Sequence, residues 1–416
     1  MTAFDSLFPD ETTPSLLGRA LRHLTPSYRP APLVLARGQG CEVFDRDGTR
    51  YLDMVGGIAV NSLGHAHPRL VAAIAAQAAQ LIHVSNLYLN EPSIALADKL
   101  SALTGFDRCF FGNSGAEANE AALKVARRYQ TVVRGAPNKI GILSFDNSFH
   151  GRTVGALSVT GQPKYHQGFE PLLPGPHFVP FGDLAAVDQA LGAAAATSTP
   201  IGTIIVEPIQ CEGGINMPPP GFLEGLRERA DAHDLVLIFD EVQTGVGRTG
   251  RWFCFEHHGL RPDVLTTAKG IAGGVPLGVM MTTDRIAEAL QPGTHASTFG
   301  ANPLATRAAL EVLRVIEDDG LLVQAHAHGE HLHAALRALA ARHPDKVTDV
   351  RGRGLIQGLD LASADLATRI VDGARAHGLL LNAVHGTTLR FVPPLIVSIA
   401  ELDAAVAIVG TLLDLS

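Results

Sequence analysis

The fold is determined by three consecutive segments, IGTIIVEPI (201–209), FLEGLRERADAH (222–233) and LVLIFDEV (235–242). The first and third are apolar, rich in β-branched residues and bounded by Gly, Pro or polar residues, which predicts strands buried on both faces. The second has apolar residues at helical spacing and charges on its other side. A strand, a helix and a second strand in this order predict a mainly parallel sheet covered by helices, the α/β class.

The carboxyl-terminal third has a different character. The segment ATRAALEVLRVIEDDG (305–320) predicts a helix, and GLLLNAV (378–384) and TLRFVPPL (388–395) are strand candidates. Together they predict a mixed α+β unit. We therefore expect a large domain at 66–310 and a smaller domain formed by both chain ends, in which residues 1–65 join residues 311–416.

The composition of the chain limits its partners and location. The 416 residues are 46% hydrophobic and 18% charged, with a net charge of −8, which suits a soluble protein and argues against nucleic acid as a partner. No run approaches the roughly 18 apolar residues of a membrane span, and the acidic start does not resemble a secretory signal. The four cysteines form no CxxC pair. We expect a cytoplasmic protein without disulfides or zinc.

The clearest candidate site pairs Asp240 with Lys269. Asp240 follows five apolar residues and should point out of the carboxyl end of a buried strand, where α/β sheets bind ligands. A carboxylate there can keep a pyridine nitrogen protonated, as pyridoxal phosphate (PLP) chemistry requires. Lys269 lies in TTAKGIAGGVPLG (266–278), whose small residues leave space for a ring, and desolvation would keep its amine neutral. The spacing alone leaves open an acidic strand end beside a surface lysine.

Two further motifs can be interpreted either as ligand-binding segments or as ordinary structural ones. The segment GNSGAEANEAALKVARR (112–128) begins with a flexible polar turn before an alanine-rich helix, whose N-terminus would hold a phosphate. It is also typical of an ordinary helix capped by Asn113 or Ser114. In FHGRT (149–153), the aromatic ring would stack on a planar group and the arginine would bind a carboxylate. A core phenylalanine beside a surface arginine is the alternative.

The motifs taken together carry a family resemblance. From about residue 25 to the C-terminus, their order and spacing resemble the class III aminotransferases of fold type I, which is more specific than any one motif. The motifs are GGIAVNSLGHAHP (56–68), NSGAEANE (113–120), FHGRT (149–153), VEPIQCEGG (206–214), FDEVQTGVGRTG (239–250), TTAKGIAGG (266–274) and STFGANPLA (297–305).

The resemblance implies roles around PLP. Lys269 would bind PLP covalently and shuttle a proton to and from the substrate carbon. Asp240 would pair with the pyridine nitrogen, Gln243 would bond the ring hydroxyl and Phe149 would stack on the ring. Phosphate contacts are implied for Ser114, Gly115 and Ala116, and for Ser297 and Thr298 reaching across from the neighbouring subunit of a homodimer.

The resemblance also implies two substrate-binding ends. Arg152, helped by Tyr28, would bind the carboxylate farther from the reacting carbon. Arg390 would bind the α-carboxylate of 2-oxoglutarate, and Glu212 would mask it while the amine donor is present. Two residues depart from the family pattern: Ala116 stands where Thr is common, and Cys211 replaces a frequent Gly before Glu212.

Within the family, HVSNLYLNEPSIALADKL (83–100) and LLLNAVHGTTLRFVPPL (379–395) look most like the members that act on N-acetylornithine. The resemblance implies transfer of its terminal amine to 2-oxoglutarate, giving N-acetylglutamate semialdehyde and glutamate in arginine biosynthesis. The alternatives are ornithine, succinylornithine or 4-aminobutyrate as donor, or a PLP aminomutase or decarboxylase of the same fold. A non-catalytic PLP-dependent regulator would need an added DNA-binding domain and a basic patch, which we do not find.

The histidine-rich segment HAHGEHLH (326–333) suggests a metal site at first sight. It lacks the HExxH arrangement, and its histidines spread around a predicted helix without a carboxylate to complete a ligand set. We therefore expect no metal.

Overall fold

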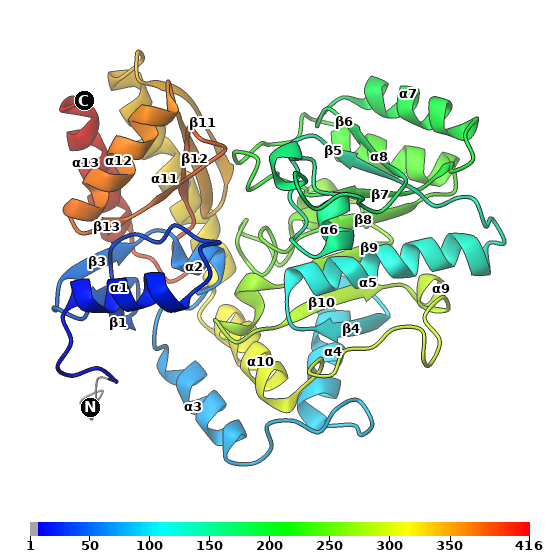
Figure 1. The fold of residues 1–416 in the computed structure, drawn as a ribbon, viewed down its shortest axis with the longest axis horizontal. Helices are drawn as coiled ribbons and strands as arrows, with labels where there is room; N and C mark the ends of the chain where they lie inside the picture. Colours follow the sequence, from blue (N-terminus) through cyan, green and yellow to red (C-terminus); the bar gives the residue numbers. More distant parts are fainter. Residues whose placement is uncertain (1–6) are drawn as a thin grey trace.

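The structure is a computed structural model that describes residues 7–416. The chain folds into two lobes (Figure 1). The larger lobe is built on a seven-stranded sheet with the order β4-β10-β9-β8-β7-β5-β6. Five neighbouring strands, from β6 to β9, run parallel, and β10 runs antiparallel to both of its neighbours. The strands are β4 (Arg108–Gly112), β5 (Gly141–Phe145), β6 (Pro176–Val179), β7 (Ile201–Val206), β8 (Val236–Asp240), β9 (Val264–Thr267) and β10 (Gly278–Thr282).

The predicted strand, helix and strand at the centre of the chain are confirmed as β7, α8 (Phe222–Ala232) and β8. Every residue of β7 and β8 is buried, because successive side chains enter cores on opposite faces of the sheet. Ile205 and Ile238 pack with α5 (Gly115–Arg128), whereas Ile204 and Phe239 pack on the side of α8. The sheet is therefore covered on both faces, as Figure 1 also shows.

Within residues 7–416, the smaller lobe combines N-terminal and C-terminal segments of the chain (Figure 1). One of its sheets has the order β1-β2-β3-β13, so Leu379 of the C-terminal part pairs with Leu52 of the N-terminal part. The other has the order β11-β12-β15-β14. The strands are β1 (Leu35–Gln39), β2 (Glu42–Asp45), β3 (Arg50–Asp53), β11 (Val347–Arg353), β12 (Ile356–Leu361), β13 (Leu379–Leu380), β14 (Asn382–Val384) and β15 (Thr388–Phe391).

The prediction of a single strand at 378–384 is wrong. The chain crosses from one sheet to the other within this segment, so it forms two short strands, β13 paired with β3 and β14 paired with β15. The strand predicted at 388–395 ends at Phe391, just before two prolines that have no N–H to donate. Helix α10 (Pro303–Asp318) runs unbroken across the expected boundary at 310/311, and the domain limits remain predictions.

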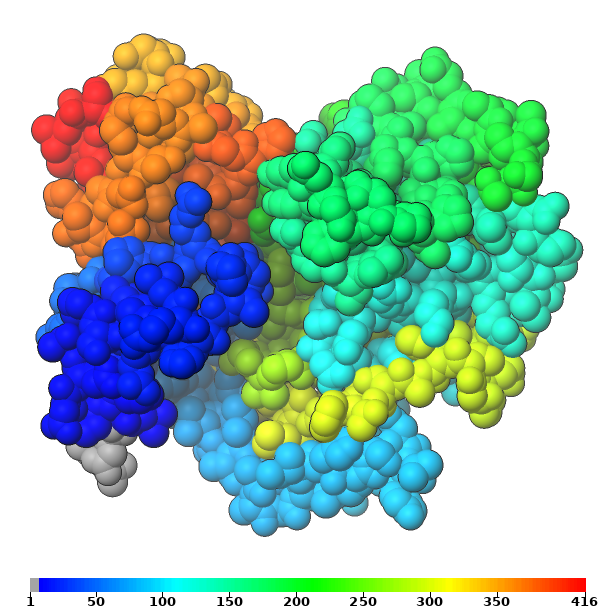
Figure 2. All heavy atoms as spheres, viewed as in Figure 1, coloured from blue at the N-terminus to red at the C-terminus, as the bar shows by residue number. Residues whose placement is uncertain are grey.

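The remaining helices surround these sheets. They are α1 (Thr13–His23), α2 (Gly56–Ala59), α3 (Pro68–Ala78), α4 (Glu91–Thr104), α6 (Val154–Ser158), α7 (Leu184–Ala195), α9 (Asp284–Ala287), α11 (Leu321–Arg342), α12 (Ala364–Ala376) and α13 (Ile399–Asp414), with short 3₁₀ or π turns η1 (Tyr129–Val133), η2 (Pro163–Tyr165), η3 (Cys254–His258) and η4 (Lys269–Ala272). Within 7–416, no helix is long and apolar enough to cross a membrane. A furrow separates the two lobes in Figure 2.

Candidate active site

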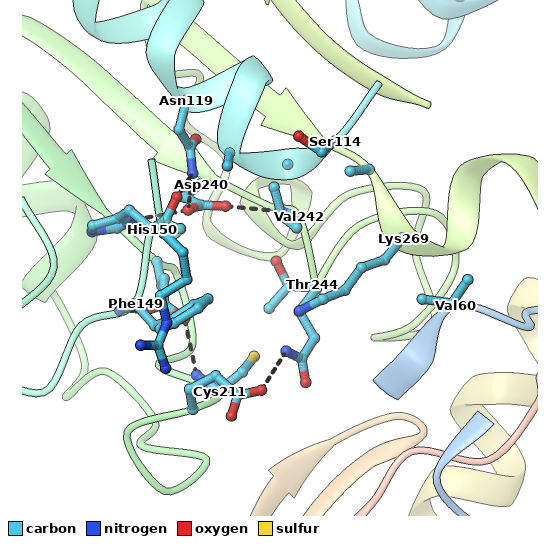
Figure 3. A pocket seen from close by; sticks show the side chains of 18 of the residues that line it. Val60, Ser114, Asn119, Phe149, His150, Cys211, Asp240, Val242, Thr244 and Lys269 are labelled. Atoms are coloured by element: carbon cyan, nitrogen blue, oxygen red, sulfur yellow. Dashed lines mark hydrogen bonds and ion pairs between the residues drawn. The ribbon is translucent and has the colours of Figure 1, made fainter. Parts of the chain in front are cut away.

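A cavity of about 410 Å³ lies beyond the carboxyl ends of β5, β7, β8 and β9 (Figure 3). Parallel strands present their carboxyl ends at one edge of the sheet, so residues far apart in sequence meet there. Most of the predicted site residues line this cavity: Ser114, Gly115, Ala116, Phe149, Arg152, Glu212, Asp240, Gln243 and Lys269.

Asp240, the last residue of β8, is buried and held by three donors. Asn119 Nδ2 donates to Asp240 Oδ2 over 2.7 Å, and His150 Nδ1 lies 2.8 Å from the same oxygen. The backbone N–H of Val242 donates to Oδ1 over 3.0 Å. Asn119 is itself oriented by Thr266, whose hydroxyl donates to its carbonyl oxygen over 2.7 Å. The Asp240 carboxylate is therefore fixed in orientation at one end of the cavity.

Lys269 follows β9 and extends its side chain into the cavity (Figure 3). Its backbone has φ 40°, a left-handed conformation that is rare for a residue with a side chain and common at functional sites. The next residue is anchored, because Ser62 Oγ donates to the Gly270 carbonyl over 3.1 Å. Burial lowers the pKa of Lys269, and the negative charge of Glu212 opposes that shift. The lowered pKa favours the neutral, nucleophilic amine.

The start of α5 forms the third part of the cavity wall. Ser114 caps this helix, and its side chain accepts the Glu117 N–H over 3.2 Å. The cap and a phosphate site are compatible, since the N–H groups of Gly115 and Ala116 have no acceptor within the helix and can bind an anion. A Cβ at position 115 would lie 2.7 Å from Val242 Cγ1, so the close approach requires glycine.

Arg390, which is buried, and Glu212, which is partly exposed, form an ion pair at the other end of the cavity. Arg390 comes from β15 of the smaller lobe and is fully buried, and its Nη1 also donates to Gln243 Oε1 over 3.0 Å. Burial alone would raise the pKa of Glu212, but the positive charges of Arg390 and Lys269 outweigh it and lower that pKa. Glu212 is therefore a carboxylate that neutralises Arg390.

Arg152 lies exposed at the edge of the cavity. Its guanidinium carbon is 3.6 Å from the ring centroid of Tyr165 and 5.5 Å from that of Phe149. The two rings meet edge-on with centroids 6.2 Å apart. Tyr165 was not predicted from the sequence, and it holds the arginine beside the cavity.

Four predicted residues do not line this cavity themselves. Arg390 reaches it only through Glu212 and Gln243, which line the cavity and accept hydrogen bonds from Arg390 Nη1. Tyr28 is 86% exposed. Ser297 and Thr298 line a separate cavity of about 290 Å³ together with Asn113 and Phe299. Asn113 Nδ2 donates to Ser297 Oγ over 3.3 Å, which ties that cavity to the turn before α5. The roles suggested for Tyr28, Ser297 and Thr298 remain predictions.

Three buried polar residues of the site were missed: Asn119, His150 and Glu207. All lie inside the motifs quoted above. Glu207 follows β7 as Asp240 ends β8, so its place at a strand end was a usable signal. Burial raises its pKa to about 7. Among residues 7–416, no group of His, Cys, Asp and Glu is arranged to hold a metal ion, and all four cysteines are free.

Comparison with known proteins gives a consistent picture. The family model for Aminotransferase class-III matches residues 24–413. An acetylornithine aminotransferase of Myxococcus xanthus is 47% identical over 395 residues, covering 95% of this chain and 96% of the relative. The same enzyme of Methanocaldococcus jannaschii is 45% identical, covering 91% of this chain and 93% of the relative.

The structure is also similar to solved structures of aminotransferases with two different names. The ornithine aminotransferase of Toxoplasma gondii has a TM-score of 0.93 at 31% identity, covering 97% of this chain and 96% of that one. The acetylornithine aminotransferase of Elizabethkingia anophelis has a TM-score of 0.86 at 32% identity, covering 98% and 100%.

Proposed function

Because the chain belongs to the class III aminotransferases, which depend on PLP, we propose that it transfers the terminal amine of N-acetylornithine to 2-oxoglutarate. The products are N-acetylglutamate semialdehyde and glutamate, in a step of arginine biosynthesis. The similarity over 95% of the chain to an acetylornithine aminotransferase carries this proposal. The ion pair between Glu212 and Arg390 supports it, because the reaction needs one site for two different substrates.

The residues of the cavity fit PLP. When bound, PLP withdraws electrons from the substrate carbon that carries the transferred nitrogen. Asp240, oriented by Asn119 and His150, supplies a fixed negative charge for the ring nitrogen. The start of α5 supplies N–H donors for the phosphate, and Lys269 supplies a buried amine that binds PLP and moves a proton at the substrate carbon.

Glu212 and Arg390 give each substrate an appropriate partner. The reacting carbon of N-acetylornithine carries no carboxylate, so Glu212 pairs with the buried Arg390 and prevents an uncompensated charge. The α-carboxylate of 2-oxoglutarate takes the place of Glu212 on Arg390. Gln243 also contacts Arg390 and keeps the guanidinium in place during the exchange.

Arg152 favours an acylated donor at the outer end. The α-carboxylate of an ornithine derivative reaches Arg152, which brings the α-nitrogen close to the same guanidinium. Free ornithine has a charged ammonium there, whereas the acetylated nitrogen is neutral. A polar group left unpaired costs ~1–3 kcal/mol, so we expect N-acetylornithine to exceed ornithine by roughly 10–100-fold in kcat/KM.

The test compares kcat/KM for N-acetylornithine, N-succinylornithine, ornithine and 4-aminobutyrate with 2-oxoglutarate saturating. We expect N-acetylornithine to exceed ornithine, and 4-aminobutyrate to be poorest because it has no α-nitrogen. Higher values for ornithine or 4-aminobutyrate would overturn the substrate while leaving the family in place.

The proposal includes a cytoplasmic homodimer with active sites at the interface. Leu87, Tyr88, Leu89 and Phe299 are large, exposed apolar residues, as expected of a surface that a partner covers. Asn86 Nδ2 donates to the Ser297 carbonyl over 2.9 Å, which places this segment beside the residues expected to reach a neighbouring site. Sedimentation should show a dimer, and a fully active monomer would contradict the proposal.

A further inference from the structure

Glu207 connects two loops of the candidate active site. Its Oε1 accepts the backbone N–H of Phe149 over 2.8 Å, and its Oε2 accepts the backbone N–H of Cys211 over 3.1 Å. Phe149 follows β5 and lines the cavity, whereas Cys211 immediately precedes Glu212. One buried carboxylate therefore determines the distance between the loop of the stacking ring and the loop of the Arg390 partner.

The loop that carries Glu212 is held at both ends. Cys211 is buried, and its Sγ donates to the Ile209 carbonyl over 3.3 Å in addition to the bond with Glu207. At the other end, Arg351 Nε of the smaller lobe donates to the Gly214 carbonyl over 2.9 Å. Because the backbone on both sides is anchored, we expect the Glu212 side chain rather than its backbone to move in the exchange on Arg390.

The bonding of Glu207 requires a carboxylate of this length. Each of its two oxygens accepts one N–H, so an amide would accept one bond and direct its own N–H₂ at the other donor. An aspartate keeps both oxygens but is shorter by one methylene group. Glu241 provides a natural comparison, because it is also buried and accepts the N–H groups of Cys254 and Phe255. Its third donor, Thr244, lines the cavity, but Glu241 and those two amides do not.

From this geometry we infer that Glu207 is a positioning residue for the exchange on Arg390. It holds Glu212 where it pairs with Arg390 while an ω-amine reacts, and it holds Phe149 against the ring of PLP in the same arrangement. The inference rests on the proposed function, because it assigns Glu207 to the step that distinguishes the two substrates.

Two measurements on the holoenzyme of Glu207→Gln test the inference. In hydrogen exchange, the amides of Phe149 or Cys211 should exchange roughly fivefold faster than in the wild type, the effect of one lost hydrogen bond. In single-turnover reactions, the ratio of the rate constants for N-acetylornithine and glutamate should fall by a similar factor. The ratio falls because only the ω-amine needs Glu212 on Arg390, whereas a displaced Phe149 slows both donors.

The matched control is Glu241→Gln, which should accelerate exchange at Cys254 or Phe255 and leave the donor ratio unchanged. If Glu207→Gln does not fold, Glu207→Asp gives the same two measurements. An unchanged donor ratio together with a general loss of rate would overturn the inference, as would an equal shift in Glu241→Gln. A wild type that reacts with none of the ω-amines would instead contradict the proposed function.

Discussion

The two ends of the cavity are built from different interactions. At one end, Asp240 receives three hydrogen bonds, from Asn119, His150 and the backbone of Val242, all within the larger lobe. At the other end, Glu212 of the larger lobe meets Arg390 of the smaller lobe in an ion pair of opposite charges. The first carboxylate has no competing partner, whereas the second occupies a position that another carboxylate can take.

This difference assigns a task to each end. On the proposed function, hydrogen bonds from fixed neighbours would keep the Asp240 charge in place through both half-reactions. A buried arginine cannot be left without a counter-charge, so any departure of Glu212 requires a substrate carboxylate to arrive. Substitutions at Asp240 should therefore slow the reaction of both amine donors by similar factors. Substitutions at Glu212 or Arg390 should slow one donor more than the other.

The largest effect is expected at Lys269, which lines the same cavity. Lys269→Ala removes both the amine proposed to bind PLP and the group proposed to move the proton, and should lower turnover by about 10⁴-fold or more for either donor. Borohydride treatment of the wild type should label Lys269. Lys99→Ala, at a surface ion pair with Glu317, should change turnover by less than about twofold. A Lys269→Ala enzyme with wild-type turnover would disprove the assignment.

Asp240→Asn should have the next largest effect. It preserves the shape of the side chain but removes the charge proposed to keep the ring nitrogen protonated, at a cost of about 3–5 kcal/mol. We expect kcat to fall by roughly two to four decades with both donors. Asp188→Asn, at a surface pair with Arg229, is the control. A change below about threefold would mean that Asp240 does not face the ring.

The next expected effect is one of pH on stability. Burial raises the pKa values of Glu207 and Glu241 from 4.5 to about 7. The folded state therefore holds these protons more tightly than the unfolded state, and stability falls as pH rises from about 4.5 to 7. Ionisation of each carboxyl group should lower the free energy of unfolding by about 2 kcal/mol between pH 5 and pH 8.

Urea unfolding of the wild type and Glu241→Gln isolates the contribution of Glu241, since all other titrating groups are common to both proteins. As pH rises from 5 to 8, the free energy of unfolding of Glu241→Gln should increase by about 2 kcal/mol relative to that of the wild type. A difference that does not change with pH would show that the Glu241 pKa is not raised.

Much of the central sheet follows from local sequence. The runs at 201–209 and 235–242 are apolar because both faces of the sheet are covered, and this burial is what identifies them as strands. The place of Asp240 follows from the same pattern. The division of 378–384 between two sheets could not be predicted, because both strands are short and each is defined by a distant partner.

The candidate site was predicted less completely than the fold. Asn119 and His150 bond Asp240 from 121 and 90 positions away, and Glu207 bonds Phe149 from 58 positions away. Contacts between such distant residues leave no periodic signal in the sequence. Tyr28, Ser297 and Thr298 came from the family resemblance alone, and their expected contacts involve a second subunit or a bound substrate. A single chain does not bring them to the cavity.

The contrast between a fixed and an exchangeable end is tested most directly by Glu212→Ala in single-turnover reactions with N-acetylornithine and glutamate. We predict that the N-acetylornithine rate falls by roughly tenfold or more, since Arg390 loses its partner, while the glutamate rate is maintained or rises. Asp240→Asn, measured in parallel, should slow both donors by similar factors. Equal losses for both donors in Glu212→Ala would contradict the account.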